Sequence, residues 1–321
     1  MIQAVVNQPD ETRRIRLTVD EPVNADSMLA SLALHAIPGV EVTDRAAGTH
    51  RRLVPTAAGP HAVTVAISAR EVLVEVEGSA DFALADPSEL IRFVRRWLDL
   101  DADLAAVREV LGDDTVIGPL LAARPGLRII GYPYGFEAAV MTVLGQQVSL
   151  AACRTFGGRV AEAWGSDGPG GLRLFPDAPR LAALTPDELQ QEIRVTGARA
   201  RTVHALAEAC ADGLLIVPEN DHDDIRRRLL ALPGIGPWTA DYLAVRALGD
   251  RDAFTPGDLV LRRALGGVSA KDAAARAIAW SPYRAYALAH LWASDPMSHA
   301  RPVPSVPAPA PAPASVRPRR G

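Results

Sequence analysis

The sequence predicts an α+β protein, in which a small N-terminal antiparallel-sheet domain precedes a mostly α-helical core. Two observations lead to this prediction. Runs at 62–67 and 72–77 are rich in valine, and the second alternates apolar and charged residues as a half-exposed antiparallel strand does. From Pro87 onward, apolar residues instead recur at helical spacing.

The same patterns predict four segments along the chain. Residues 1–12 are expected to be a flexible N-terminus, 13–86 an α+β domain, 87–300 an all-α core of two helical subdomains with a cleft between them, and 301–321 a disordered Pro/Ala-rich tail. A strand at 15–19 and a helix from about 26 to 36 open the small domain. The expected helices of the core are 87–98, 101–111, 136–144, 149–164, 185–194, 198–211, 223–231, 239–247, 258–265, 270–279 and 282–293. Thr185 begins one of them with a capping box.

Composition excludes several classes of protein. The chain has 321 residues, 48% of them hydrophobic and 22% charged, with no apolar run long enough to cross a membrane and no secretory signal at its start. We therefore expect a cytoplasmic protein that does not contact membranes. Two cysteines, Cys153 and Cys210, fit a reducing compartment and cannot form a cysteine-rich metal centre.

A glycine-rich segment at 232–240, LPGIGPWTA, lies between two predicted helices. Gly234 and Gly236 permit a tight hairpin whose backbone can approach another surface. The amide hydrogens that begin the next helix are then free to bind an anion, for which a DNA phosphate is the natural candidate. Taken alone, the segment is equally consistent with a turn that only joins two packed helices.

A single carboxylate follows the hairpin at a fixed distance. Asp258 ends the loop FTPGD twenty residues after Trp238, at the start of a predicted helix. An aspartate there often only caps the helix. Capping does not prevent the same carboxylate from stabilising a positive charge nearby.

The whole pattern resembles the helix-hairpin-helix DNA glycosylase superfamily, and within it the AlkA-type 3-methyladenine DNA glycosylase II enzymes. The resemblance runs from about Met28 to Ala293 through GYPYGFEAAVMTVLGQQVS, LPGIGPWTADY, FTPGDLVLRR and SPYRAYALAHLW. It implies a helix-hairpin-helix glycosylase core and an enzyme that flips alkylated bases, such as 3-methyladenine and 7-methylguanine, out of damaged double-stranded DNA and hydrolyses their N-glycosidic bond. We expect a monomer without a cofactor. The N-terminal domain matches the family's extra domain in position and size.

The resemblance also assigns roles to residues. Asp258 would be the catalytic carboxylate, steadying the positive sugar that forms as the bond breaks. Trp238, Tyr242 and Trp292 would form the base pocket, where their electron-rich rings attract a positively charged base. The alternative for these three aromatic residues is an ordinary place in the core.

The position of Trp238 separates two mechanisms. Bifunctional relatives have a lysine there that cleaves the strand through a Schiff base. Lys271 is the only lysine in the chain and lies far from the hairpin, so a lyase step is disfavoured. Two cysteines also exclude the four-cysteine iron-sulfur cluster of other relatives.

The remaining predicted contacts are with DNA. Gln146 and Gln147 match the loop that fills the gap left by the flipped base, although relatives often have leucine at the position of Gln147. The DNA-binding hairpin comprises Leu232, Gly234, Ile235, Gly236 and Thr239. No catalytic metal is expected, but the resemblance implies a monovalent ion held by the carbonyls of Leu232 and Ile235. Ser31 stands where one relative has an aromatic residue, which points to a different base preference.

A net charge of −4 is unusual for a protein that binds DNA by bulk electrostatics. Arginines at 226–228, 262 and 263 are candidates for phosphate contact, although charge runs on helices are more often solvated. Two alternatives stay open: a non-catalytic helix-hairpin-helix DNA-binding module, and a glycosylase for oxidised or mismatched bases. The chain also has no cysteine cluster for methyl capture, and it could derive from a larger fusion.

Overall fold

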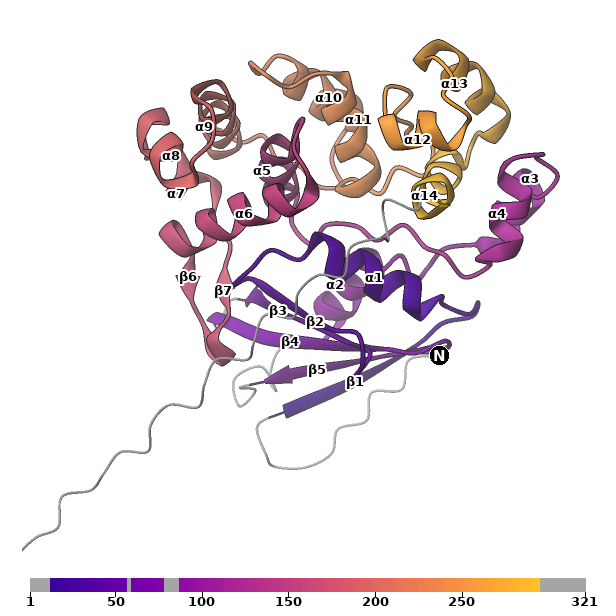
Figure 1. Ribbon diagram of the computed structural model, residues 1–321. Helices are drawn as coiled ribbons and strands as arrows, with labels where there is room; N and C mark the ends of the chain where they lie inside the picture. The colour runs from indigo at the N-terminus through magenta and orange to yellow at the C-terminus, as the bar shows by residue number, and fades with distance from the viewer. Residues whose placement is uncertain (1–11, 57–58, 78–86, 295–321) are drawn as a thin grey trace, which may run out of the picture.

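The computed structural model describes residues 12–56, 59–77 and 87–294. A sheet forms one layer, two helices cover it, and the remaining helices lie beyond them (Figure 1). This arrangement confirms the predicted fold class. The expected flexible N-terminus at 1–12, the domain boundary at 86 and the tail at 301–321 lie almost entirely outside the described residues.

The sheet has five antiparallel strands in the spatial order β1 (Thr12–Thr18), β5 (Glu71–Glu77), β4 (Gly59–Ile67), β3 (Thr49–Thr56) and β2 (Glu41–Asp44). Val63 lies opposite Val76 and Val65 opposite Val74, and these valines are buried. The predicted strands β1, β4 and β5 are confirmed. Strands β2 and β3 were not expected, because the two arginines and the proline of THRRLVPT interrupt the apolar alternation.

Helices α1 (Ala25–His35) and α2 (Ser88–Trp97) cover the face of the sheet that is turned toward the other helices (Figure 1). Asn24 begins α1, since its side chain accepts a hydrogen bond of 3.0 Å from the Ser27 amide. Met28 of α1 and Val94 of α2 join the valines of the sheet in one hydrophobic core. The N-terminal sheet therefore holds α1 in place from below.

Every helix expected in the core is present. Besides α2, which corresponds to the expected helix 87–98, they are α3 (Leu104–Leu111), α5 (Gly135–Gly145), α6 (Leu150–Trp164), α8 (Pro186–Ile193), α9 (Gly197–Ala211), α10 (His222–Leu230), α11 (Pro237–Arg246), α12 (Leu259–Ala264), α13 (Ala270–Ala277) and α14 (Arg284–Ser294). The capping box at Thr185 is confirmed. Two short helices were not expected, α4 (Ile117–Ala123) and α7 (Ala178–Ala182), because one or two turns contain too few apolar repeats to predict.

These helices form two hydrophobic clusters. One is built mainly from α5–α10, the other from α3, α4 and α12–α14. Helix α11 contributes Leu243 to the first cluster and Val245 to the second. It therefore runs between the two groups of helices. Within the described residues, no helix is long and apolar enough to cross a membrane.

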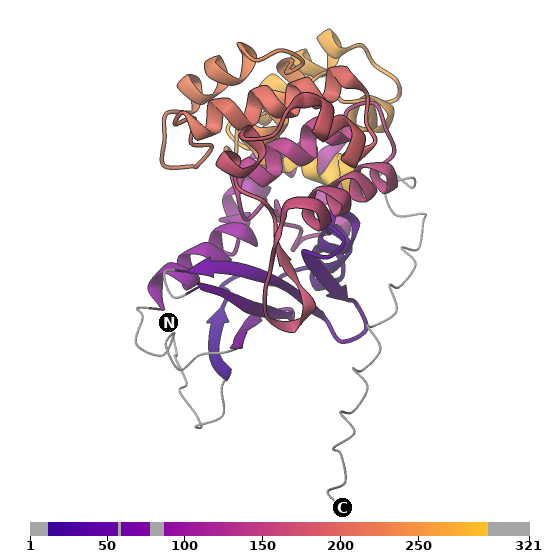
Figure 2. The same cartoon turned by 90° about the vertical axis from the view of Figure 1, so that its left-hand side faces the viewer.

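A short hairpin of β6 (Ser166–Asp167) and β7 (Arg173–Leu174) reaches from the helices down beside the sheet (Figure 2). The Arg173 amide donates a hydrogen bond of 2.8 Å to the Gly39 carbonyl, and Leu172 is buried with Leu53 and Ala62 of the sheet. The hairpin thus attaches the helical core to the N-terminal unit.

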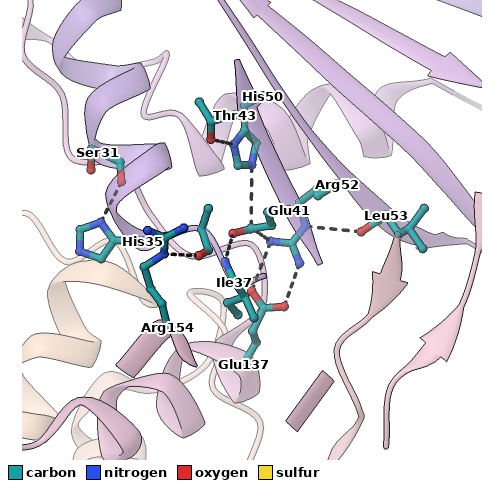
Figure 3. Close-up of polar contacts among 11 residues, drawn as sticks. Ser31, His35, Ile37, Glu41, Thr43, His50, Arg52, Leu53, Glu137 and Arg154 are labelled. Atoms are coloured by element: carbon teal, nitrogen blue, oxygen red, sulfur yellow. Dashed lines mark hydrogen bonds and ion pairs between the residues drawn. The ribbon is translucent and has the colours of Figure 1, made fainter. Parts of the chain in front are cut away.

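A buried ionic cluster also joins the sheet to the helical core (Figure 3). The Arg52 guanidinium of β3, only 1% exposed, lies 2.5 Å from Glu41 and 2.8 Å from Glu137 of α5. Burial raises the pKa of both carboxyl groups, whereas the Arg52 charge lowers it. Glu41 also accepts from the Ile37 amide at 3.2 Å, so the cluster fixes the segment that follows α1.

Candidate active site

Asp258 lies in the loop between α11 and α12 and is only 7% exposed. A turn closed by the Asp258 amide and the Thr255 carbonyl, 3.0 Å apart, places it at the start of α12. Its Oδ1 atom accepts a hydrogen bond of 2.9 Å from the Leu261 amide, which is the contact of a helix cap. Capping therefore takes up only part of the acceptor capacity of the carboxylate.

Two indole groups hold the rest of this carboxylate. Trp238 donates from Nε1 to Oδ2 of Asp258 at 3.0 Å, and Trp292 donates from Nε1 to Oδ1 at 3.3 Å. In the described part of the chain, Asp258 forms no ion pair with lysine, arginine or histidine. Its negative charge is thus oriented by neutral donors and remains available to a positive charge formed beside it.

The three predicted aromatic residues lie together. The Trp238 and Tyr242 rings are stacked with centroids 5.3 Å apart, and the Tyr242 and Trp292 rings are tilted with centroids 5.7 Å apart. The first two are one helical turn apart on α11, as the four-residue spacing predicts.

A cavity of about 230 Å³ opens beside Asp258. Tyr242, Trp292 and Asp258 line it, whereas Trp238 is not among the lining residues and lies behind Tyr242. Helix α1 forms a further wall with residues that include Ser31 and His35. The cavity therefore lies between the helical core and the N-terminal unit as well as between groups of core helices.

Sequence reasoning missed several charged or polar residues that line the cavity, among them Arg246 of α11 and His35 of α1. Arg246 stands eight residues after Trp238, so Trp238, Tyr242 and Arg246 share one face of α11, and this spacing was a signal that could have found it. Burial and the Arg246 charge lower the pKa of His35 to about 3, so its imidazole is neutral at pH 7. The His35 Nδ1 atom lies 2.9 Å from the Ser31 carbonyl.

The predicted hairpin is present between α10 and α11. Gly234 has a φ of +80°, and a Cβ atom there would lie 2.1 Å from Thr202 Oγ1. Gly236 begins α11 without a side-chain cap, and Pro237 follows it. Because proline has no amide hydrogen, the first free donors of α11 are the amides of Trp238 and Thr239. Of the other hairpin residues, Ile235 is buried and Leu232 is partly buried against the core.

The predicted wedge loop lies against the hairpin. Gln147 is exposed and has a φ of +55°, in the left-handed region that few residues other than glycine adopt. Gln146 donates from Nε2 to the Gly234 carbonyl at 3.0 Å and to Thr239 Oγ1 at 3.1 Å. The Thr239 side chain is thereby buried against Gln146.

The arginines that precede the hairpin already have partners. Arg226 pairs with Asp241 at 2.9 Å, and Arg227 pairs with Asp224. Both cysteines are free thiols, and burial raises their pKa, to about 11 for Cys153 and about 12 for Cys210. The described residues contain no cluster of three or more His, Cys, Asp or Glu side chains that could hold a metal.

Comparison with known proteins agrees with this geometry. The family model of the AlkA N-terminal domain matches residues 14–132, and that of the HhH-GPD superfamily base excision DNA repair protein matches residues 140–278. DNA-3-methyladenine glycosylase 2 of Escherichia coli is 34% identical over 209 residues, which cover 64% of this chain and 71% of that protein. The chain belongs to the HhH-GPD superfamily, as an AlkA-type member.

Two further relatives extend the comparison. The probable bifunctional transcriptional activator/DNA repair enzyme AlkA of Mycobacterium tuberculosis is 38% identical over 293 residues, which cover 88% of this chain. The matched part spans 57% of that relative's length. The structure of a 3-methyladenine DNA-glycosylase from Archaeoglobus fulgidus superposes with a TM-score of 0.75 at 21% identity, covering 86% of this chain and 96% of that one, and shows the same fold.

Proposed function

We propose that this AlkA-type HhH-GPD protein is a monofunctional DNA glycosylase that hydrolyses the N-glycosidic bond of alkylated bases in duplex DNA. Its substrates would be 3-methyladenine, 7-methylguanine and similar bases, flipped into the cavity, and its product an abasic site. The observation that carries the proposal is a carboxylate held by two indoles on the wall of an aromatic cavity, with no cationic partner among the described residues.

Asp258 would act on the sugar. Cleavage of the glycosidic bond leaves positive charge on the deoxyribose, as in other glycoside hydrolysis. A carboxylate oriented before the reaction stabilises that charge without reorganising, and Trp238 and Trp292 supply this orientation from two directions. The same carboxylate can orient the water that adds to the sugar carbon.

The cavity wall would receive the base. Trp292 and Tyr242 both line it, and Trp292 offers the aromatic surface on which a flipped heterocycle can stack. An alkylated purine that carries a positive charge leaves as a neutral molecule and therefore needs little help in departing. Trp238 acts indirectly, by supporting Tyr242 and by orienting Asp258.

The hairpin and the wedge loop would hold the duplex. The amides of Trp238 and Thr239 are free to bind a phosphate, and amides add nothing to the net charge, which reconciles DNA binding with a charge of −4. Exposed Gln147 would fill the gap left by the flipped base. The carbonyls of Leu232 and Ile235 would hold a monovalent ion beside the phosphate; Leu232 O accepts one bond from the Ile235 amide at 3.3 Å and keeps a second lone pair.

A release assay on a panel of duplexes tests the proposal. Purified chain would be incubated with duplexes that each contain one alkylated, oxidised or mismatched base, and the freed base would be measured by chromatography. Release of alkylated bases supports the proposal, and preferential release of oxidised or mismatched bases would support the other glycosylase. Binding to every duplex without release of any base would instead support a non-catalytic DNA-binding module. We further propose that the protein is a cytoplasmic monomer.

A further inference from the structure

Arg246 places a positive charge inside the cavity that would receive the base. It lines the cavity and is only 7% exposed. Within the described residues no carboxylate forms an ion pair with it, and its buried Nε atom has no hydrogen-bond partner. An unpaired buried guanidinium is costly, which suggests that its charge serves a ligand.

The charge of the cavity differs from that expected of a site selective for cations. Among the lining residues, Arg128 and Arg246 are positive, Asp258 is negative and His35 is neutral at pH 7. Arg128 donates from Nη1 and Nη2 to the backbone carbonyls of Asp99 and Glu21, at 2.8 and 2.9 Å, and only its buried Nε lacks a partner among the described residues. Among the described contacts Arg246 donates only from Nη1, to the Tyr242 hydroxyl at 3.3 Å, so it has more donor capacity left for a base than Arg128.

Arg246 also occupies an aromatic face that a cationic base would need. Its guanidinium carbon lies 5.7 Å from the Tyr242 ring centroid and 5.2 Å from that of Tyr132. Trp238, which lies one turn before Tyr242 on α11, stacks on the same Tyr242 ring. Tyr242 thus lies between an indole and a guanidinium, and Trp292 remains as the aromatic wall that a positively charged base can use.

Asp258 and Arg246 approach the cavity from different elements. Asp258 begins α12 and contacts Trp238, whereas Arg246 lies at the end of α11, eight residues after Trp238. The Arg246 side chain turns back toward Tyr242, whose hydroxyl oxygen lies 3.3 Å from Nη1. With the sugar at Asp258, a flipped base would enter the cavity that Arg246 also lines.

The positive charge of Arg246 matters for bases that carry no charge. When the bond between C1′ and the base nitrogen breaks, both electrons leave with the base. A cationic base then departs neutral, whereas a neutral base departs as an anion, which takes a proton from water while the remaining hydroxide adds to C1′. We propose that Arg246 stabilises this departing anion and so extends the reaction to neutral lesions; this inference rests on the proposed glycosylase function.

Two lesions that differ mainly in charge test the role of Arg246. Hypoxanthine and 7-methylguanine are both oxopurines, but only the second is cationic in DNA. Single-turnover rates of release would be measured for both lesions with the same preparation of wild type and of Arg246→Met. Because the ratio of the two rates compares one preparation with itself, a loss of folded protein cancels.

We expect the hypoxanthine-to-7-methylguanine ratio to fall about tenfold in Arg246→Met, the effect of one charged contact to the leaving group. Arg246→Lys keeps the charge and should give a higher ratio than Arg246→Met. Arg92→Met, which removes an exposed arginine of α2, should leave the ratio unchanged.

A fall of less than fivefold in Arg246→Met would overturn the inference, as would an Arg246→Lys ratio no higher than that of Arg246→Met. Wild type that releases 7-methylguanine but no hypoxanthine would overturn it too. Wild type that releases neither base, nor any other lesion of the panel, would instead contradict the proposed function itself.

Discussion

Removal of the Arg52 guanidinium should destabilise the fold far more than removal of its neighbour on the same strand. Arg52→Met leaves Glu41 and Glu137 buried, 9% and 3% exposed, without the cation that lies 2.5 and 2.8 Å from them. Breaking a buried ion pair from one side costs about 3–5 kcal/mol, which for a chain of this size lowers Tm by roughly 10 °C. Arg51→Met is the matched control: Arg51 is 30% exposed and pairs with Glu77 at 2.5 Å, so its loss should cost at most about 1 kcal/mol.

The stability lost in Arg52→Met should also depend on pH, in a direction set by the pKa shifts of Glu41 and Glu137. Burial raises the pKa of Glu41 and Glu137 in the folded chain above the unfolded value, so their protonation favours the folded state at low pH, and this contribution is lost as pH rises through the folded pKa. Without Arg52 both pKa values rise further. Chemical denaturation should therefore show a smaller gap between Arg52→Met and wild type at pH 5 than at pH 8. An Arg52→Met loss no greater than that of Arg51→Met, or a gap that widens at pH 5, would refute the reasoning.

Three further predictions concern the site and the hairpin. Trp292→Phe keeps the aromatic wall but removes the indole donor 3.3 Å from Asp258, so single-turnover base release should fall roughly tenfold while DNA affinity in a gel-shift assay stays the same; equal loss of both would argue against an orienting role. Gly234→Ala places a Cβ atom 2.1 Å from Thr202 Oγ1 at a φ of +80° and should weaken DNA binding at least tenfold. Gly236→Ala is the control, because its Cβ atom meets nothing within 4 Å, and it should change DNA affinity less than threefold. Similar effects of both substitutions would contradict the hairpin geometry. The reaction products should be intact strands with abasic sites, and borohydride should trap no covalent complex, because Trp238 has no amine to form a Schiff base; strand cleavage on a denaturing gel without alkali would disprove this.

The sequence predicted those elements whose pattern is local. Helix α11, the hairpin before it and Asp258 all lie within 27 residues, and the spacing of Trp238 and Tyr242 alone indicates a shared helix face. The strands β4 and β5 were predicted because they are rich in valine, and in β5 every second residue is a valine that faces the core. In these cases the residues that form an element lie close together in the sequence, so their spacing alone predicts it.

Elements that depend on distant partners were missed. Strand β3 contains Arg52, which is tolerated in a buried position because Glu137 lies 85 residues later in the chain, and no pattern near Arg52 reveals that partner. The cavity wall formed by α1 was missed for the same reason. His35 and Arg246 both line the cavity, but they are more than 200 residues apart in the sequence. The prediction of a cleft between two helical subdomains therefore did not include the wall that the N-terminal unit supplies.

The catalytic role of Asp258 can be tested by one substitution in single-turnover base release. Asn caps helices as well as Asp, so Asp258→Asn can keep the bond to the Leu261 amide at the start of α12, while it removes the charge and replaces the oxygen that accepts from Trp238. Asp103→Asn, at the matching cap of α3, is the control. We predict that Asp258→Asn releases a 7-methylguanine base at least roughly a hundredfold more slowly than wild type with unchanged DNA affinity, while Asp103→Asn keeps the wild-type rate. Release by Asp258→Asn at the wild-type rate would show that the carboxylate does not stabilise the sugar cation.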